Sequence, residues 1–357
     1  MVMYPDLSFV EKQAYFMQKE FSGKDAESLN STLDKCIKLV KSNSLGEAIL
    51  KGAGYEEKTS IDKFTVEKIY IGNRGKVRGG HCGLISAIDN DENKKNARGE
   101  IYINEDFVRK ISAELGEKNS VIYLSNLITH EFLHGNQRRC EGIENKVENS
   151  RSGLANPRTE ETKKDLTAEN QQKIYNDIQE NKEDYTRMIL TEAASMAAGL
   201  TVCFQLCNKE NQDVIINYAL NDIKCMANVS ENTIPRLTEK FKELPHTKEE
   251  QQKFSLSLFR ILTNGEMEYL SKISGNKPLD IQLSDYGDLL NTTYNKDLFG
   301  SRADFDQTIA LVDARNRVLK NIKQNQSITE DVESKFTKTG DDRRILPAVV
   351  RTKKEYQ

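Results

Sequence analysis

The sequence predicts an α+β protein that is mostly helical, with one small and mainly antiparallel sheet. The chain is rich in Lys, Glu, Asn and Gln and has only 20 Gly and 6 Pro among its 357 residues, which favours helix. Apolar residues also recur at helical spacing over long stretches. The sheet is predicted by three short β-branched or aromatic runs between residues 66 and 104, which turn-forming residues separate.

Composition excludes several classes of protein. The net charge of -3 excludes a generally basic protein that coats nucleic acid, and no clustered basic face indicates a nucleic-acid partner. No run approaches the roughly 18 apolar residues of a membrane span. The N-terminus lacks the basic and apolar regions of a signal peptide, and the six cysteines show no CxxC spacing. We therefore expect a cytoplasmic protein, or one exported without a cleaved signal peptide.

Composition shifts divide the chain into four parts. A helical segment is expected first, because Leu33, Cys36 and Val40 fall at helical spacing. A core with a polar insert follows, then a second helical region and a polar, flexible tail. The predicted boundaries are 1–60 for the N-terminal helical segment, 61–207 for the core with its insert at 141–185, 208–325 for the C-terminal helical domain and 326–357 for the tail.

Within the core, the elements are predicted in order from their patterns. The runs at 66–71, 84–88 and 100–104 are predicted strands with turns at 72–80 and 89–99, and this spacing suits hairpins and an antiparallel sheet. A long helix is then expected at 120–139 and a shorter one at about 168–182. The segment 185–207 is the most apolar of the chain and is flanked by charge, so a buried helix is expected there.

Residues 130–134, HEFLH, form an HExxH motif inside the predicted helix. Side chains four residues apart project from one face of a helix, so His130 and His134 can bind one metal ion. Glu131 can reach a water on that ion without filling the coordination sphere. Zinc lowers the pKa of such a water, and the carboxylate takes its proton as the water attacks a carbonyl. The alternative is a pair of surface histidines, which the apolar neighbours disfavour.

A catalytic zinc site needs a third protein ligand. His81 and His246 are candidates by residue type, but Glu192 lies in the middle of the most apolar helix. A buried carboxylate is costly unless a metal, a cation or a proton neutralises it. The small residues at 193–199 would let this helix approach the HExxH helix closely. The cations that could pair with Glu192 instead are Arg138, Arg139 and Arg187.

The segments HEFLHGNQ at 130–137 and TEAASMA at 191–197 resemble zinc metallopeptidases that pair HExxHxxQ with a downstream EAxA-type helix. These are zincin-like proteins of the glutamate-ligand kind (gluzincins), several of them bacterial and some regarded as effectors. The resemblance covers residues 66–207 and implies a zincin-like catalytic core. It implies that His130, His134 and Glu192 bind the metal, that Glu131 is the general base, and that Gln137 lies near the site.

The chain departs from the better-known glutamate zincins in two ways. The interval from His134 to Glu192 is long, because the polar insert fills it. The ExxxD pattern is also absent, since Met196 stands four residues after Glu192. A ligating histidine usually donates its second N–H to a carboxylate or a carbonyl, and the motifs do not indicate which group does this here.

Further residues are candidates for supporting the ligands or contacting the substrate, namely His81, Gln137 and Tyr286. A donor that stabilises an oxyanion is also expected, with Tyr218, Tyr286 and His246 as candidates. The strand at 100–104 is predicted either to pair with an extended peptide substrate or to be an ordinary interior strand.

The motifs together predict a zinc-dependent endopeptidase that acts on a protein or peptide substrate. Two alternatives share the same residues. One is a non-catalytic helical interaction protein with a structural metal site, which four protein ligands would close. The other is a metal-dependent hydrolase of a non-peptide amide, with the same ligands and a narrower pocket.

Overall fold

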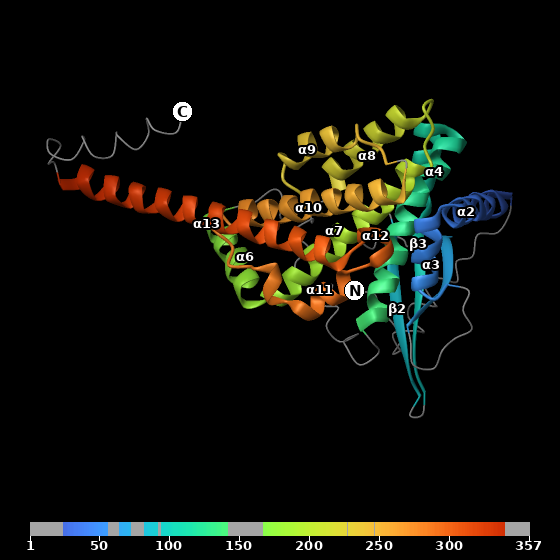
Figure 1. Cartoon of the computed structure of the whole chain (residues 1–357), viewed down its shortest axis with the longest axis horizontal. Helices are drawn as coiled ribbons and strands as arrows, with labels where there is room; N and C mark the ends of the chain where they lie inside the picture. The colour runs from blue at the N-terminus through green and yellow to red at the C-terminus, as the bar shows by residue number, and fades with distance from the viewer. Residues whose placement is uncertain are drawn as a thin grey trace, which may run out of the picture.

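The computed structural model describes residues 24–55, 64–72, 82–91, 94–141, 167–226, 228–245 and 247–339. Most of these residues are helical, and a single three-stranded sheet joins the helices, so the prediction of a mostly helical protein with a small sheet is confirmed. Figure 1 shows the sheet beside α2 and α3 at one end of the molecule, with the later helices extending away from it.

The N-terminal helices α2 (Lys24–Ser42) and α3 (Ser44–Gly52) pack against α4 and bury the predicted apolar face. Leu33, Cys36 and Val40 are all buried there. Between the helices, the Asn43 side chain accepts a hydrogen bond from the Gly46 N–H, which caps the start of α3.

The sheet contains β1 (Thr65–Gly72), β2 (Cys82–Asp91) and β3 (Lys94–Asn104) in the order β1-β3-β2. The prediction of a mainly antiparallel sheet was wrong for β1, which pairs with β3 in parallel, while β2 and β3 pair antiparallel. That prediction assumed that strands next to each other in sequence pair with each other. Instead β3 lies between the other two, which buries Ile101 and Ile103 beside Ile69 and Ile71.

The position of β3 also decides between the two predictions for residues 100–104. Both edges of this strand are paired, from Glu100 to Ile103, with β1 on one side and β2 on the other. It is therefore an interior strand, and its backbone has no open edge for a peptide. The predicted turn at 89–99 was also wrong over most of its length, because β2 extends to Asp91 and β3 starts at Lys94.

Helix α4 (Glu105–Glu141) contains the predicted helix at 120–139 and starts fifteen residues before it. Gly116 interrupts its helical geometry with φ of 73°, a conformation that other residues adopt only with strain. The part after Gly116 packs against α2, α3 and α7 and carries the HExxH motif.

Helix α7 (Lys182–Gln205) follows α6 (Ala168–Glu180) and is the predicted buried helix. By length and composition it is the one helix of the described residues that could cross a membrane, yet 72% of its most apolar window is buried inside the protein. It packs against α4, α10 and α11, so its apolar composition is that of a core helix. Helix α6 lies within the predicted polar insert; residues 142–166 are outside the described part.

The second helical region begins with α8 (Gln212–Met226), α9 (Thr233–Lys240) and α10 (Lys248–Ile273). Helix α10 lies along α7 and shares a continuous apolar core with it, through side chains such as Phe254 and Leu258. Ser255 on α10 also bonds Thr201 on α7 over 3.0 Å. The predicted domain boundary near residue 207 therefore lies between helices that contribute to one core, and the division into domains stays a prediction.

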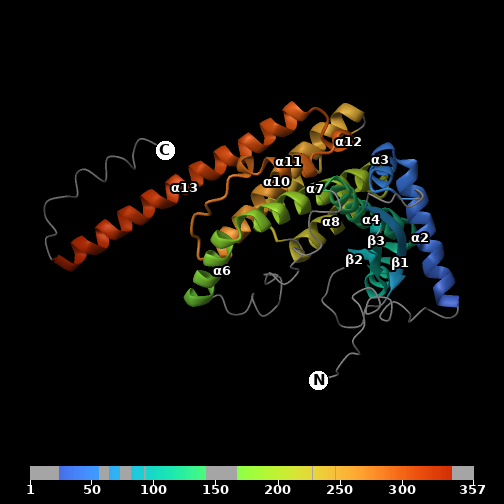
Figure 2. The same cartoon turned by 90° about the horizontal axis from the view of Figure 1, so that it is seen from below.

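The last elements are η1 (Leu283–Asp285), α11 (Gly287–Thr293), α12 (Lys296–Phe299) and α13 (Arg302–Thr339). Figures 1 and 2 show α13 running beside α10 and projecting beyond it. Residues 326–339 of the predicted tail therefore belong to a helix, while 340–357 lie outside the described residues. The tail prediction relied on polar composition, which does not distinguish an exposed helix from an irregular segment.

Candidate metal centre

His130 and His134 project from one face of α4, as their spacing predicts. Their Nε2 atoms lie 3.1 Å apart, and the two rings meet edge to face with centroids 4.7 Å apart. Both side chains are partly buried, with 16% and 17% of their surface exposed. The two nitrogens therefore face the same point at the edge of the core.

Glu192 reaches the same point from α7. Its Oε2 lies 3.5 Å from His130 Nε2, and its Oε1 lies 3.7 Å from His134 Nε2. The ligand atoms of these three side chains lie within 4.8 Å of one another, which is close enough to hold a metal ion. The structure thus brings together the three residues predicted as ligands, although Glu192 is 58 positions from His134 in the chain.

The spacing of the three ligand atoms can be compared with a real coordination sphere. Ligands about 2.0–2.1 Å from a tetrahedral ion lie about 3.3 Å from one another. The two imidazole nitrogens lie 3.1 Å apart, close to that value. The Glu192 carboxylate approaches each ring with a different oxygen, Oε2 at 3.5 Å from His130 Nε2 and Oε1 at 3.7 Å from His134 Nε2. Two imidazole nitrogens and one carboxylate oxygen are also a usual donor set for zinc. These three side chains could therefore hold a metal ion, and the described residues add no fourth ligand to the group.

Small residues allow α7 to approach α4 closely at this point. Ala193, Ala194 and Ala197 are fully buried. A Cβ atom on Gly199 would lie 2.2 Å from the Asn126 Oδ1 and 2.5 Å from the Asn126 carbonyl oxygen. The predicted close approach of the two helices is therefore present, and it places the Glu192 carboxylate within reach of both imidazoles.

Glu131 lies beside the ligand group. Its Oε1 is 3.9 Å from His130 Nε2, and the residue is only 5% exposed. Glu131 is not a member of the group whose ligand atoms all lie within 4.8 Å of one another, so its carboxylate lies next to the candidate ligands and not among them. Its role as a general base stays a prediction.

Two neutral side chains contact the far side of the His134 ring. The Gln137 Oε1 lies 3.1 Å from His134 Nδ1, and the Ser195 Oγ lies 3.3 Å from the same nitrogen. Gln137 was predicted near the site, but Ser195 was not. Its signal in the sequence is its position one turn after Glu192, on the same face of α7.

The remaining predicted residues are His81, His246, Tyr286 and Tyr218. His81 and His246 lie outside the described residues. Tyr286 lies at the start of α11, which packs against α4 and α7, and its role at the site stays a prediction. Tyr218 packs edge to face against Tyr123, with ring centroids 4.8 Å apart, and burial raises its pKa above the usual value.

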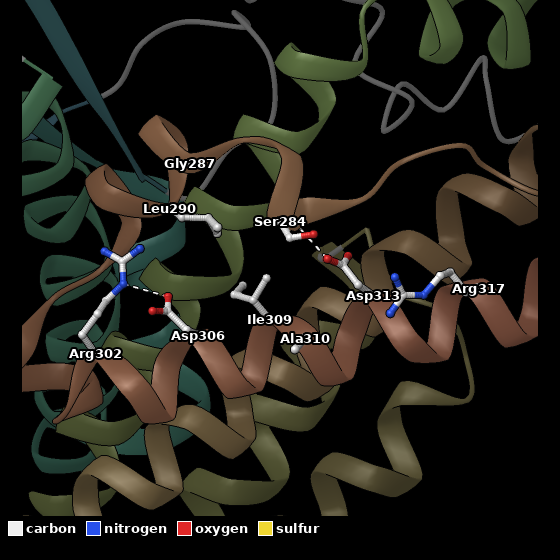
Figure 3. Close-up of a pocket in the computed structure, with 9 residues that line it drawn as sticks. All are labelled: Ser284, Gly287, Leu290, Arg302, Asp306, Ile309, Ala310, Asp313 and Arg317. Carbon is white, nitrogen blue, oxygen red and sulfur yellow. Dashed lines mark hydrogen bonds and ion pairs between the residues drawn. The ribbon is translucent and has the colours of Figure 1, made fainter.

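A separate pocket of about 360 Å³ lies between α13 and the segment of η1 and α11 (Figure 3). Its charged side chains are engaged within the fold. The Asp313 carboxylate accepts the N–H groups of Leu283 and Ser284, and Arg302 Nε donates to Asp306 over 2.7 Å. Since none of its lining residues is a member of the metal-binding group, the pocket is not part of the candidate site.

No protein-family model, curated protein or solved structure matches this chain. The resemblance to glutamate zincins therefore depends on the two motifs at 130–137 and 191–197, and on the convergence of His130, His134 and Glu192.

Proposed function

We propose that this protein is a zinc-dependent metallopeptidase with a zincin-like core, and that it cleaves within protein or peptide substrates. The observation that carries this proposal is the convergence of His130, His134 and Glu192 on one point with Glu131 beside it. The resemblance in the motifs supports the choice of zinc and of a peptide bond over another amide.

Each residue has a distinct part in the proposed reaction. A bound zinc ion supplies Lewis acidity to a water and to the scissile carbonyl. Glu131 accepts the proton that the attacking water loses and delivers it to the leaving amine. Burial of Glu131 keeps bulk water away from its carboxylate, so the proton passes between fixed partners.

The number of ligands separates this proposal from a structural metal site. A structural zinc site is closed by four protein ligands, whereas a catalytic site leaves one position for water. The group formed by the described residues has three members, two histidines and one glutamate. This set favours an enzyme over the interaction protein that was the alternative prediction.

The test compares the wild type with Glu131→Gln. We expect both proteins to bind one equivalent of zinc, because Glu131 is not a ligand, and only the wild type to cleave proteins of a denatured lysate or a peptide library. A matched control is Glu117→Gln, which changes an exposed glutamate of the same helix and should cleave like the wild type.

Two results would contradict the proposal. If zinc-loaded wild type and Glu131→Gln released the same peptides at the same rate, Glu131 would not be the general base. If the purified wild type bound zinc through four protein ligands, as measured by X-ray absorption, the metal would be structural.

A further inference from the structure

We propose that Gln137 and Ser195 act as a reversible hydrogen-bonding pair for His134, which supports one ring tautomer when a metal is bound and the other when it is not. The inference rests on the proposed metal site and adds two positioning residues to it. Each of these two side chains can either accept or donate a hydrogen bond. A carboxylate, which commonly contacts the second nitrogen of a ligating histidine, can only accept one.

The pair is built into the core. Gln137 is 3% exposed and Ser195 is fully buried. Both side chains meet the same atom, His134 Nδ1, over 3.1 and 3.3 Å. They come from different helices, Gln137 from the turn of α4 after His134 and Ser195 from α7. The ring is therefore held between the two helices that also carry the ligands.

In the first arrangement, the proton of the His134 ring is on Nδ1. The Nδ1–H donates to the Gln137 Oε1, and the Ser195 hydroxyl oxygen is a second acceptor. The Nε2 atom then presents its lone pair toward His130 and Glu192, as a metal ligand must. This is the arrangement expected with a metal ion in place.

The second arrangement follows from the distance between the two imidazoles. Two Nε2 atoms 3.1 Å apart repel through their lone pairs unless a metal ion lies between them or one nitrogen carries a proton. If that proton is on His134, its Nδ1 becomes an acceptor. Its single lone pair can then accept from the Ser195 O–H or, once the Gln137 amide has turned over, from the Gln137 NH₂ group.

Gln137 itself indicates that both arrangements are within reach. Its Nε2 is buried and has no hydrogen-bond partner within the described part of the chain. A buried donor without a partner is unfavourable, because it has lost its hydrogen bonds to water. If the Gln137 amide turned over, its NH₂ group could donate to His134 Nδ1. The NH₂ group therefore lacks a partner in the metal-bound arrangement and can gain one when the metal leaves.

A carboxylate at this place would behave differently. It only accepts hydrogen bonds, so it holds His134 in the Nδ1–H tautomer in both states and raises the basicity of the ring. Met196 stands where the ExxxD pattern has its carboxylate, and the neutral pair contacts the second histidine of the motif. The structure thus points to a site that binds its metal less tightly and releases it more readily.

The first measurement is the tautomer of His134, read from long-range ¹H–¹⁵N spectra of protein labelled at histidine, in alkaline buffer where imidazoles are neutral. Without metal, the wild type should show a substantial fraction of the Nε2–H form at His134, and zinc should convert it to Nδ1–H. Gln137→Glu should show Nδ1–H in both states, because its carboxylate only accepts.

The second measurement is zinc affinity by competition with a chelator. Gln137→Met and Ser195→Ala should each weaken binding by about 10-fold or more, and Gln137→Glu should bind at least as tightly as the wild type, which a merely structural role would not predict. Gln205→Met is the matched control, because Gln205 lies on α7 but bonds Asn43 and Gln251 away from the ligands.

The proposal is overturned if metal-free wild type shows His134 only as Nδ1–H, or if Gln137→Met and Ser195→Ala bind zinc like the wild type while folded by circular dichroism. These readouts do not use proteolysis. A protein that binds zinc and switches tautomer but cleaves nothing would therefore contradict only the proposed function. A protein that binds no zinc would overturn both.

Discussion

A single glycine controls how closely the two helices of the candidate site approach. Gly199 faces Asn126 on α4, and any side chain at position 199 would overlap both the amide and the backbone carbonyl of that residue. The backbone cannot move aside as the end of a flexible side chain could. The position of Glu192, two turns earlier on α7, thus depends on the absence of a Cβ atom at residue 199.

We expect Gly199→Ala to lower the free energy of unfolding by about 1–3 kcal/mol, because overpacking forces α7 away from α4. Zinc affinity should fall as well, since the Glu192 carboxylate moves with the helix. Urea denaturation and chelator competition measure the two effects. Gly287→Ala is the control, because a Cβ there meets nothing within 4 Å and the variant should remain within about 0.5 kcal/mol of the wild type. Equal stability of the two variants would contradict this account of the helix contact.

At the scale of elements, α10 supports α7 from the side opposite to α4. Its start is defined by a capping box, in which the Thr247 side chain accepts from the Glu250 N–H and the Glu250 carboxylate accepts from the Thr247 N–H. This satisfies two donors that the helix itself leaves open. Farther along, Phe254 packs beside Phe204 of α7, with ring centroids 6.4 Å apart. A well-defined helix start therefore sets the register of the α10–α7 contact.

Thr247→Ala should lower the free energy of unfolding by about 1 kcal/mol, because the exposed side chain contributes a cap and little packing. Thermal or urea unfolding measures the change. Thr292→Ala provides the comparison, since this partly buried threonine donates to the Asp288 carbonyl within its own helix and caps no helix start. If Thr247→Ala lowered the free energy of unfolding no more than Thr292→Ala does, the capping box would not contribute to stability.

At the scale of the whole molecule, an ion-pair cluster joins segments that are far apart in sequence. Asp280 lies 2.9 Å from Lys182 at the start of α7 and 2.6 Å from Lys320 on α13. Hydrogen bonds from Lys320 and Lys182 lower the pKa of Asp280 to about 2 from its usual 3.8. Through Asp280, the cluster links α13 to α7, the helix that carries Glu192.

The lowered pKa predicts a pH dependence of stability. Unfolding releases Asp280 from both lysines, so its contribution is complete above about pH 4 and is lost as the pH falls toward about 2. Because the two lysines are about one third exposed and Asp280 is about half exposed, solvent screens the pairs and the total effect should be no more than about 1 kcal/mol. Urea unfolding at several pH values in this window should show a smaller slope for Asp280→Asn than for the wild type. Parallel slopes would mean that the pairs do not contribute.

Much of the candidate site was predictable because its main signal is local. The pairing of His130 with His134 follows from helical geometry, which any four-residue interval shares. Glu192 was predictable because it is the one carboxylate of the apolar segment 185–207, and burial of an unpaired charge is unfavourable. Ser195 was not, because a serine on a buried helix is common and its contact with His134 depends on the crossing of two helices. The order of the strands in the sheet was also missed. The pattern of apolar residues in a strand indicates which face is buried, but it does not indicate which other strand pairs with it.

By itself, the sequence determined that the protein is mostly helical, that the segment 185–207 is an apolar helix, and that two imidazoles and a carboxylate share a helix turn at residues 130–134. These properties depend on residues within a few positions of one another. The tertiary structure alone decided that β3 pairs with β1 in parallel, that α7 approaches α4 at Gly199, and that Ser195 meets His134. Such contacts join residues that are distant in the chain, and their geometry is set by the packing of the whole core.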